Sequence, residues 1–369
     1  MIPIAEPLLG KEELDNIIKA VKSGWISSKG KFILEFEEGF AKYCGAKHGV
    51  ATSSGTTALH LALVALGIGD GDEVIVPTLT FIATANAVTF TGAKPVFVDC
   101  HPQYWCMDPN ELEDKITSKT KAIIPVHLYG HPCDMDQIKA VAEAHRLWVV
   151  EDAAEAHGAE YKGRKVGAFS DIACFSFFGN KIITTGEGGM CLANDEGIAA
   201  RLRILRDHGQ NPNRRYWHDV VGFNYRMTNM QAAIGVAQLD KIGKLIERRR
   251  QVAAWYAEAM ADLQGDAGLS LPVEMPWARS VYWMYSILLS PGSSVTRDAV
   301  AKKLEEGGIE TRPLFFPLHL MPPYSGFGRF AVAEDISRRG LTLPSGYNIG
   351  EAEVTEICGQ ISSCLGTRS

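Results

Sequence analysis

The spacing of apolar positions predicts two helices at the start of the chain. Residues 11–22 place four aliphatic side chains on one helical face among acids and lysines, which is typical of an amphipathic helix. The segment from Gly24 to Gly30 interrupts this pattern. A second predicted helix then carries apolar side chains between Phe32 and Tyr43.

Short apolar runs then alternate with helical segments. A run at 50–52 leads through a turn of small residues into a strong helix from Gly55. Helical segments such as Met135–His145 separate most of the later runs, which predicts a mostly parallel sheet covered on both faces. The later predicted strands are Val74–Val76, Pro95–Val98, Ala122–Val126 and Leu147–Val150.

The pattern changes after a predicted long helix at 229–246. A proline-containing loop at 269–275 precedes an apolar strand at 281–289, and Thr296 begins a helix that Gly307-Gly308 ends. We therefore predict a large α/β domain over residues 1–240 and a small α+β domain over residues 241–369. We expect roughly the first 15 residues to pack on the small domain.

Composition limits the possible functions. The 369 residues are 46% hydrophobic and 22% charged, enough for two domains with a sizeable core. A net charge of −6 disfavours a nucleic-acid surface. The eight cysteines form no C-x-x-C pair, so we expect reduced thiols and no metal site. No signal-peptide pattern or membrane-length apolar run is present, so we predict a cytoplasmic protein with no membrane partner.

Three motif stretches directly follow predicted strands. They are Pro77–Phe81, His127–Gly130 and Glu151-Asp152. Ligands of open parallel sheets bind beyond the carboxyl ends of the strands. We therefore expect these stretches to meet in one crevice.

Lys181 is the strongest candidate for chemistry. It follows the aromatic run Phe175–Phe178 and precedes the glycine-rich segment 186–190. Apolar surroundings disfavour the charged form of a lysine, so its amine becomes a better nucleophile. This suits a Schiff base with an aldehyde cofactor or a carbonyl substrate. The alternative is a lysine that only extends into solvent from a strand end. The upstream Asp152 disfavours this alternative.

A pyridoxal phosphate site requires a lysine, a carboxylate at the pyridine nitrogen, an aromatic face and a phosphate cradle. Lys181, Asp152 and Phe81 can supply the first three. The helix start Gly55-Thr56-Thr57 with Ser176 can supply the cradle, because backbone N–H groups at a helix start face outward. Each piece has a structural alternative, since small-residue turns also cap helices and aromatic residues also fill cores.

These motifs together resemble the sugar aminotransferases of the DegT/DnrJ/StrS type, a family of fold type I (aspartate aminotransferase-like) pyridoxal phosphate enzymes. The resemblance extends from Gly24 to Tyr324. It implies a large domain with a mixed, mostly parallel sheet and a smaller α+β domain at the carboxyl end. The motifs are Ser54–Leu59, Pro77–Phe81, Glu151–Ala154, Ser176–Lys181 with Gly186–Gly189, and Gly222–Asn229.

The resemblance implies a role for each motif residue. Lys181 would bind the cofactor aldehyde and later move a proton. Glu155 would lie near the phenolic oxygen of the cofactor, where many relatives have glutamine; an anion there would repel the phenolate, so we expect it protonated or turned away. Asn224 would reach the phosphate from a neighbouring subunit, which implies a homodimer with shared sites and leaves a tetramer open. The other cofactor contacts would be Gly55, Thr56, Thr57, Phe81, Asp152 and Ser176.

A second set of polar residues is expected to contact the sugar or the diphosphate. Of these, His157 can equally be structural. Arg214 and Arg215 suit phosphate oxygens but can also be solvated loop charges. The expected substrate contacts are Trp25, Ser27, Lys29, Tyr129, His157, Arg226, Arg312 and His319.

Some stretches resemble family members that act on GDP-4-keto-6-deoxy-D-mannose. L-glutamate would convert the cofactor to pyridoxamine 5′-phosphate, and the amine would pass to C4 of that sugar, for use in a surface polysaccharide such as the O-antigen of lipopolysaccharide. UDP- and dTDP-linked keto-sugars stay open as alternative substrates. A 3-dehydratase would carry histidine in place of Lys181, and a member that only binds the cofactor would not need an intact site. The stretches are Val126–Gly130, Phe177–Met190, Asn211–Trp217 and His319–Tyr324.

Overall fold

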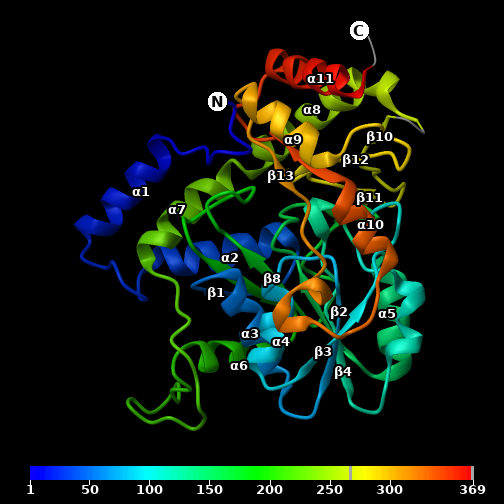
Figure 1. Cartoon of the computed structure of the whole chain (residues 1–369). Coiled ribbons are helices and arrows are strands. Elements are labelled where there is room, and N and C mark those ends of the chain that lie inside the picture. The colour runs from blue at the N-terminus through cyan, green and yellow to red at the C-terminus, as the bar shows by residue number, and fades with distance from the viewer. Residues whose placement is uncertain (266–267, 367–369) are drawn as a thin grey trace.

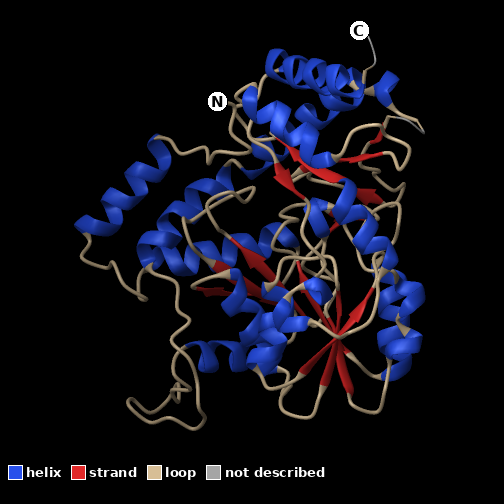
Figure 2. Ribbon diagram, viewed as in Figure 1, coloured by secondary structure: helices blue, strands red, loops and turns tan. Residues whose placement is uncertain are grey.

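The computed structural model describes residues 1–265 and 268–366. At its centre lies a seven-stranded sheet in the order β1-β9-β8-β5-β4-β2-β3, visible as red arrows in Figure 2. β9 runs antiparallel to both neighbours, and the other strands run parallel to one another, which confirms the predicted mixed sheet. The strands are β1 (His48–Thr52), β2 (Glu73–Pro77), β3 (Lys94–Val98), β4 (Thr120–Ile123), β5 (Trp148–Asp152), β8 (Ile172–Ser176) and β9 (Gly189–Ala193).

Helices pack against this sheet, and others belong to the second half of the chain (Figure 1). The helices predicted at 11–22 and 135–145 form with those bounds. The single helix predicted at 229–246 is wrong, because Lys241 leaves helical geometry (φ −110°, ψ 6°) and divides the segment. The helices are α1 (Lys11–Lys22), α2 (Lys31–Cys44), α3 (Gly55–Ala65), α4 (Ala83–Phe90), α5 (Met135–His145), α6 (Glu196–Arg206), α7 (Asn229–Asp240), α8 (Ile242–Ala259), α9 (Arg297–Glu306), α10 (Ala331–Arg339) and α11 (Glu351–Leu365).

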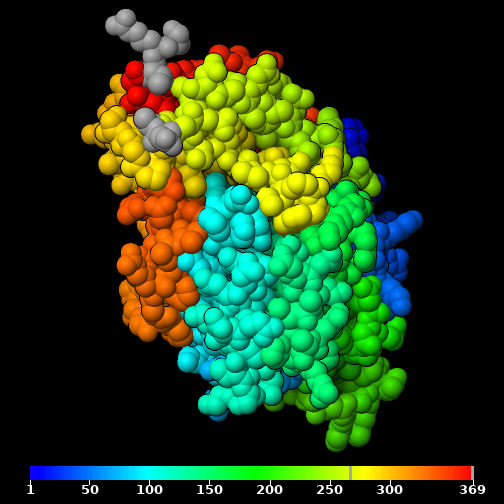
Figure 3. Space-filling view, turned by 90° about the vertical axis from the view of Figure 1, so that its right-hand side faces the viewer, coloured from blue at the N-terminus to red at the C-terminus, as the bar shows by residue number. Residues whose placement is uncertain are grey.

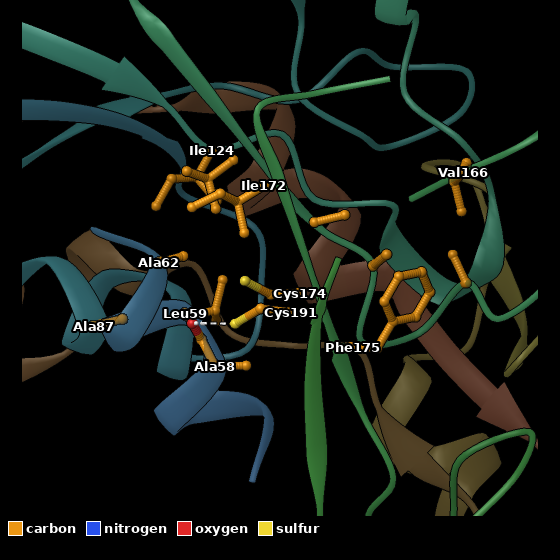
Figure 4. Close-up of a cluster of buried hydrophobic side chains, with 14 of the residues drawn as sticks. Ala58, Leu59, Ala62, Ala87, Ile124, Val166, Ile172, Cys174, Phe175 and Cys191 are labelled. Atoms are coloured by element: carbon orange, nitrogen blue, oxygen red, sulfur yellow. Dashed lines mark hydrogen bonds between the residues drawn. The ribbon is translucent and has the colours of Figure 1, made fainter. Parts of the chain in front are cut away.

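The central strands are buried on both faces, as their apolar sequences predict. Alternate residues of a strand point to opposite faces. In Figure 4, Cys174 of β8 and Cys191 of β9 face Leu59 of α3, whereas Phe175 points to the other side. The Cys191 thiol donates to the carbonyl oxygen of Ala58 at 3.3 Å, so α3 lies directly on the sheet. This contact fixes where the amino end of α3 opens beside β8.

A second, smaller apolar core lies in the later part of the chain, between a four-stranded antiparallel sheet and helices α8, α9 and α11. Its strands are β10 (Leu269–Ser270), β12 (Tyr285–Leu289), β14 (Gly340–Leu343) and β13 (Arg312–Pro313). The strand predicted at 281–289 begins only at Tyr285, because Tyr282 is left-handed (φ +46°). A three-stranded sheet adds β6 (Glu160–Tyr161), β7 (Arg164–Lys165) and β11 (Ala278–Arg279).

The two cores are not divided cleanly along the sequence. The carboxylate of Asp99, just after β3, accepts the backbone N–H groups of Val332 and Ala333 at 2.9 and 2.8 Å. Figure 3 shows this late segment, in orange, lying along the cyan part of the large sheet region. At the other end of the chain, the N–H of Ile2 donates to Gly308 at 2.7 Å. The domain boundary at residue 240 stays a prediction. Over residues 1–265 and 268–366, no helix has the length and apolarity needed to cross a membrane.

Candidate active site

A cavity of about 450 Å³ opens beyond the carboxyl ends of the central strands. Phe81 lines it after β2, and Asp152 lines it at the end of β5. The third predicted stretch, 127–130, supplies no lining residue, but Val126 just before it does. Two of the three stretches therefore meet here as expected. Lys181, on the segment that follows β8, and Trp283, on the segment that precedes β12, complete the wall.

The amine of Lys181 is held in a largely enclosed position. The side chain is 11% exposed, and Nζ lies 3.8 Å from Oε1 of Glu155. Burial lowers the pKa of Lys181, against the opposing effect of the Glu155 and Asp152 carboxylates. A neutral amine is the nucleophilic form of lysine. The geometry therefore supports a lysine that reacts with a carbonyl group.

Asp152 is the last residue of β5, and it is buried, with an exposed fraction of 5%. Its Oδ2 accepts the Thr84 hydroxyl at 2.8 Å, and its Oδ1 accepts the N–H of Ala154 at 3.2 Å. Burial raises the pKa of Asp152, and the hydrogen bond from Thr84 opposes this. A buried carboxylate on a cavity wall is stabilised when a cationic group binds beside it. A protonated pyridine nitrogen is such a group.

Glu155 faces Lys181 and does not turn away from the cavity. Its Oε2 accepts the backbone N–H of Tyr129 at 2.8 Å. Burial raises the pKa of Glu155 to about 7, although the Lys181 charge and the Tyr129 hydrogen bond oppose the shift. The carboxyl group is thus partly protonated at neutral pH and can lie close to a phenolic oxygen.

The amino end of α3 opens onto the cavity beside Ser176. Ser54 caps the helix by accepting the N–H of Thr57 at 3.1 Å. A Cβ atom on Gly55 would lie 2.7 Å from Cβ of Ser176, so glycine permits this close approach. Thr56 lines the cavity. The first N–H groups of a helix have no partner within the helix, so this end suits a phosphate.

Thr57 lies differently from Thr56. Its hydroxyl donates to the carbonyl oxygen of Ser54 at 2.9 Å and accepts the N–H of Ser54 at 3.0 Å. Thr57 is not one of the residues that line the cavity. Its role at a phosphate stays a prediction, and in this structure it closes the helix cap.

The sequence reasoning missed several cavity residues, and three of them contact predicted site residues. Thr84 binds Asp152, as described above. The ring centroids of Phe315 and Phe81 lie 5.9 Å apart. Nζ of Lys181 lies 3.7 Å from the ring centroid of Trp283. Phe315 and Trp283 belong to the later part of the chain. An aromatic residue in an apolar segment carries no local signal of such a position.

The predicted substrate residues fall into two groups, and the first lies in or under the cavity. Arg312 lines it and binds Glu310 at 3.1 Å. Tyr129 lies beneath, where its hydroxyl accepts the N–H of Phe315 at 2.9 Å. His319 is buried, with Nδ1 2.7 Å from the Thr78 hydroxyl.

His157 lies in the core, away from the cavity wall. Its ring packs against Phe40, Phe175 and Phe177 at centroid distances of 5.4 to 6.1 Å. The side chain is fully buried, and burial lowers the pKa of His157 to about 3. This environment matches the structural alternative considered for His157.

The second group does not line the cavity of its own chain. The segment from Trp25 to Lys29 is mostly exposed, and Arg226 forms an ion pair with Asp207. Asn224 is exposed on the segment between α6 and α7. The same segment carries Arg214 and Arg215, whose guanidinium carbons lie 3.9 and 4.9 Å from the ring centroids of Trp217 and Tyr216.

The fold and the lysine in this cavity define an aminotransferase of fold type I. The sequence profile of the DegT/DnrJ/EryC1/StrS aminotransferase family matches residues 7–362, and the chain belongs to that family.

Similar proteins cover the chain almost completely. The GDP-perosamine synthase of Caulobacter vibrioides is 51% identical over 99% of this chain and 98% of its own length. The GDP-perosamine synthase of Escherichia coli O157:H7 is 47% identical over 98% of each chain. The crystal structure of DesV from S. venezuelae superposes with a TM-score of 0.91 at 38% identity, over 97% of this chain and 95% of DesV. The predicted family and fold class are confirmed.

Proposed function

We propose that this protein is a GDP-perosamine synthase. It would transfer the amino group of L-glutamate to C4 of GDP-4-keto-6-deoxy-D-mannose. The observation that carries the proposal is the enclosed amine of Lys181, in a chain that is 51% and 47% identical to two GDP-perosamine synthases. A UDP- or dTDP-linked keto-sugar is the alternative acceptor. The intact Lys181 argues against the dehydratase branch, in which histidine stands at this position.

The cofactor is proposed to be pyridoxal 5′-phosphate, and the cavity residues fit it. Lys181 would take the aldehyde, Asp152 the pyridine nitrogen, and Phe81 the ring face. The amino end of α3, where Gly55 permits the close approach of Ser176, would take the phosphate. When bound, this cofactor supplies an electron sink for negative charge on the carbon beside the transferred nitrogen.

Lys181 would then act as the proton carrier of the reaction. Whenever it is not bonded to the cofactor, its Nζ would accept and return a proton. The amine can do so because burial favours its neutral form. Glu155, 3.8 Å away, can hold a proton at its carboxyl group near neutral pH. The two groups place a base and an acid next to each other in the cavity.

The cavity wall also offers a site for an anionic group of a substrate. Arg312 is the one arginine that lines it over the part of the chain that the structure describes. Its Nη2 and Nε point to one oxygen of Glu310, which leaves Nη1 available. Guanidinium groups suit carboxylate and phosphate oxygens. Arg312 would therefore bind L-glutamate or the sugar diphosphate.

We also propose a homodimer that shares its sites. α1 leaves apolar side chains unburied, with Leu14 57% and Ile18 40% exposed, and Trp25 follows at 57%. α1 projects from the body in Figure 1, as does the segment between α6 and α7. Exposed apolar patches of this kind mark interfaces. Trp25 and Asn224, which do not line their own cavity, would reach that of the partner.

Product analysis tests the proposed function. The protein is incubated with pyridoxal phosphate, ¹⁵N-labelled L-glutamate and GDP-4-keto-6-deoxy-D-mannose, and the nucleotide sugar is examined by mass spectrometry. We expect ¹⁵N in a GDP-linked amino sugar with the amine on C4. In parallel incubations with the UDP- and dTDP-linked keto-sugars, labelling of one of these and not of the GDP-sugar would support the alternative acceptor.

A further inference from the structure

Trp283 confines the amine of Lys181 from the later part of the chain. The centroid of its ring system lies 3.7 Å from Nζ. The indole N–H donates to the carbonyl oxygen of Asn180 at 2.8 Å, one residue before Lys181. Trp283 therefore contacts both the amine and the backbone that carries it. An aromatic face attracts an ammonium ion, so this contact alone favours the charged amine.

Arg249 of α8 binds the backbone of Trp283. Its Nη1 donates to the carbonyl oxygen of Trp283 at 2.6 Å and to that of Ser345 at 3.3 Å. The Arg249 side chain is buried. Trp283 therefore links a buried guanidinium group, bound to its backbone carbonyl, to the reactive amine, which lies at its ring.

The charge of Arg249 has no counter-ion. Within residues 1–265 and 268–366, no carboxylate forms an ion pair with it, and its hydrogen-bond acceptors are backbone carbonyl groups. The next residue, Arg250, binds Glu274 at 2.5 Å. Burial lowers the pKa of Arg249 to about 10, so it stays protonated at neutral pH. A buried unpaired cation is costly, and it repels any other cation nearby.

We propose that Arg249 is a positioning residue that fixes Trp283 against Lys181 and whose buried positive charge favours the neutral amine. The inference rests on the proposed role of Lys181 as nucleophile and proton carrier, but it does not depend on which sugar is used. A neutral amine is needed for both roles.

The charged groups around Lys181 shift its pKa in both directions. Asp152 and Glu155, from the end of β5, favour the ammonium form, as does the Trp283 ring. Burial opposes them most strongly, and Arg249 acts in the same direction as burial to lower the pKa of Lys181. Arg249 is thus the charged side chain that acts together with burial, although its effect on the pKa of Lys181 is smaller than that of either carboxylate.

The test measures the amine itself in the full-length protein after removal of cofactor. Acetic anhydride acetylates neutral amines, so labelling of Lys181 is followed against pH by mass spectrometry, with exposed Lys29 as internal reference. Arg249→Gln removes the charge and keeps a donor, and Arg249→Lys keeps the charge. Arg249→Met is the second neutral variant if Arg249→Gln does not fold. Thermal unfolding of every variant is recorded alongside.

A matched control comes from the preceding residue of α8. Arg248 also donates to backbone carbonyl groups, those of Tyr347 at 3.1 Å and Ile349 at 2.6 Å, and it does not touch Trp283. Arg248→Gln therefore removes a similar arginine without changing the surroundings of Lys181.

The expected result separates charge from packing. Arg249→Gln should move Lys181 labelling to higher pH and reduce it several-fold at pH 7, and Arg249→Lys should restore it. Arg248→Gln should match the wild type. A neutral variant that is less stable but labels like the wild type would overturn the proposal, since Arg249 would then only tie chain segments together. Equal loss in Arg249→Gln and Arg249→Lys would also overturn it. Failure of transamination with the GDP-sugar would leave these labelling results unaffected.

Discussion

Nζ of Lys181 lies 3.8 Å from a carboxylate oxygen of Glu155, and both groups are nearly enclosed by the protein. The two side chains follow β8 and β5, which are adjacent parallel strands of the central sheet. Their closeness in a confined space means that the charge of each influences the other. This pair determines how the protein responds to pH near neutrality.

Glu155→Gln should change how stability depends on pH. Because burial raises the pKa of Glu155 to about 7, the folded state holds a proton that the unfolded chain releases near pH 4.5. The stability linked to this group is present below pH 4.5 and is lost as pH rises to about 7. We expect the wild type to lose about 1–3 kcal/mol more than Glu155→Gln between these limits, as measured by urea unfolding. Parallel curves for the two proteins would show that Glu155 ionises normally.

His157→Phe should remove a destabilising effect of acid. The folded state keeps His157 neutral down to about pH 3, whereas an unfolded histidine titrates near pH 6.5. The stability linked to this group is present above pH 6.5 and is lost as pH falls toward 3. Between pH 7 and 4.5 the wild type should lose about 2–3 kcal/mol more than the variant. Activity should be retained, because the ring does not line the cavity. A large rise in KM for the sugar would contradict the core assignment.

Gly55→Ala should weaken binding of pyridoxal phosphate. The added Cβ would lie 2.7 Å from Cβ of Ser176, so the start of α3 and Ser176 must move apart. Overpacking costs about 1–3 kcal/mol, which corresponds to a roughly 5- to 100-fold higher Kd by fluorescence titration. Gly179→Ala is the matched control, since its Cβ meets no atom within 4 Å. Equal affinities for the two variants would show that the phosphate does not bind beside Gly55 and Ser176.

Thr84→Val should weaken the support of Asp152 while leaving the carboxylate in place. The lost hydrogen bond, 2.8 Å long, goes to a charged group, so its removal should cost about 1.5–3 kcal/mol of interaction free energy. We expect kcat to fall roughly 10- to 100-fold, with Asp152→Asn losing more. Thr89→Val, whose hydroxyl is on the same helix but bonds Tyr324 at 3.1 Å, is the control. Wild-type kcat in Thr84→Val would mean that Asp152 needs no such support.

Charged substitutions on α1 should disrupt the proposed dimer. A double variant Leu14→Glu/Ile18→Glu places two carboxylates on an exposed apolar face, and it should sediment as a monomer where the wild type is a dimer. Leu320→Glu, at 57% exposure, is the control on a different surface. A wild-type monomer, or a dimer that survives the double variant, would place the interface elsewhere.

The sequence was informative wherever one local segment determines the outcome. Lys181, Asp152 and Phe81 all follow strands of one sheet, so their meeting in one cavity follows from the direction of the strands. Gly55 stands at a helix start whose cap is encoded nearby by Ser54. For such residues, strand order and helix capping supply enough geometry to predict a shared site.

Other features depend on packing between distant segments, and the sequence does not show them. Trp283 reaches Lys181 only because Arg249 and Asn180 hold it from two other elements. His157 stands between alanine and glycine in a motif, and nothing local distinguishes a core ring from a substrate contact. Lys241 breaks an otherwise regular helical pattern, whereas the neighbouring Gly243 lies inside α8. In each case tertiary contacts override the local pattern.

The most direct test of the account is a spectrum of the two half-reactions in one sample. L-glutamate is added to the protein with bound pyridoxal phosphate, the excess is removed, and keto-sugar nucleotides are added one at a time. We predict that glutamate bleaches the visible absorbance band and that GDP-4-keto-6-deoxy-D-mannose restores it, whereas Lys181→Ala shows neither change. Restoration by a UDP- or dTDP-sugar alone would contradict the proposed substrate. If no visible band forms with added cofactor, the role assigned to Lys181 is wrong.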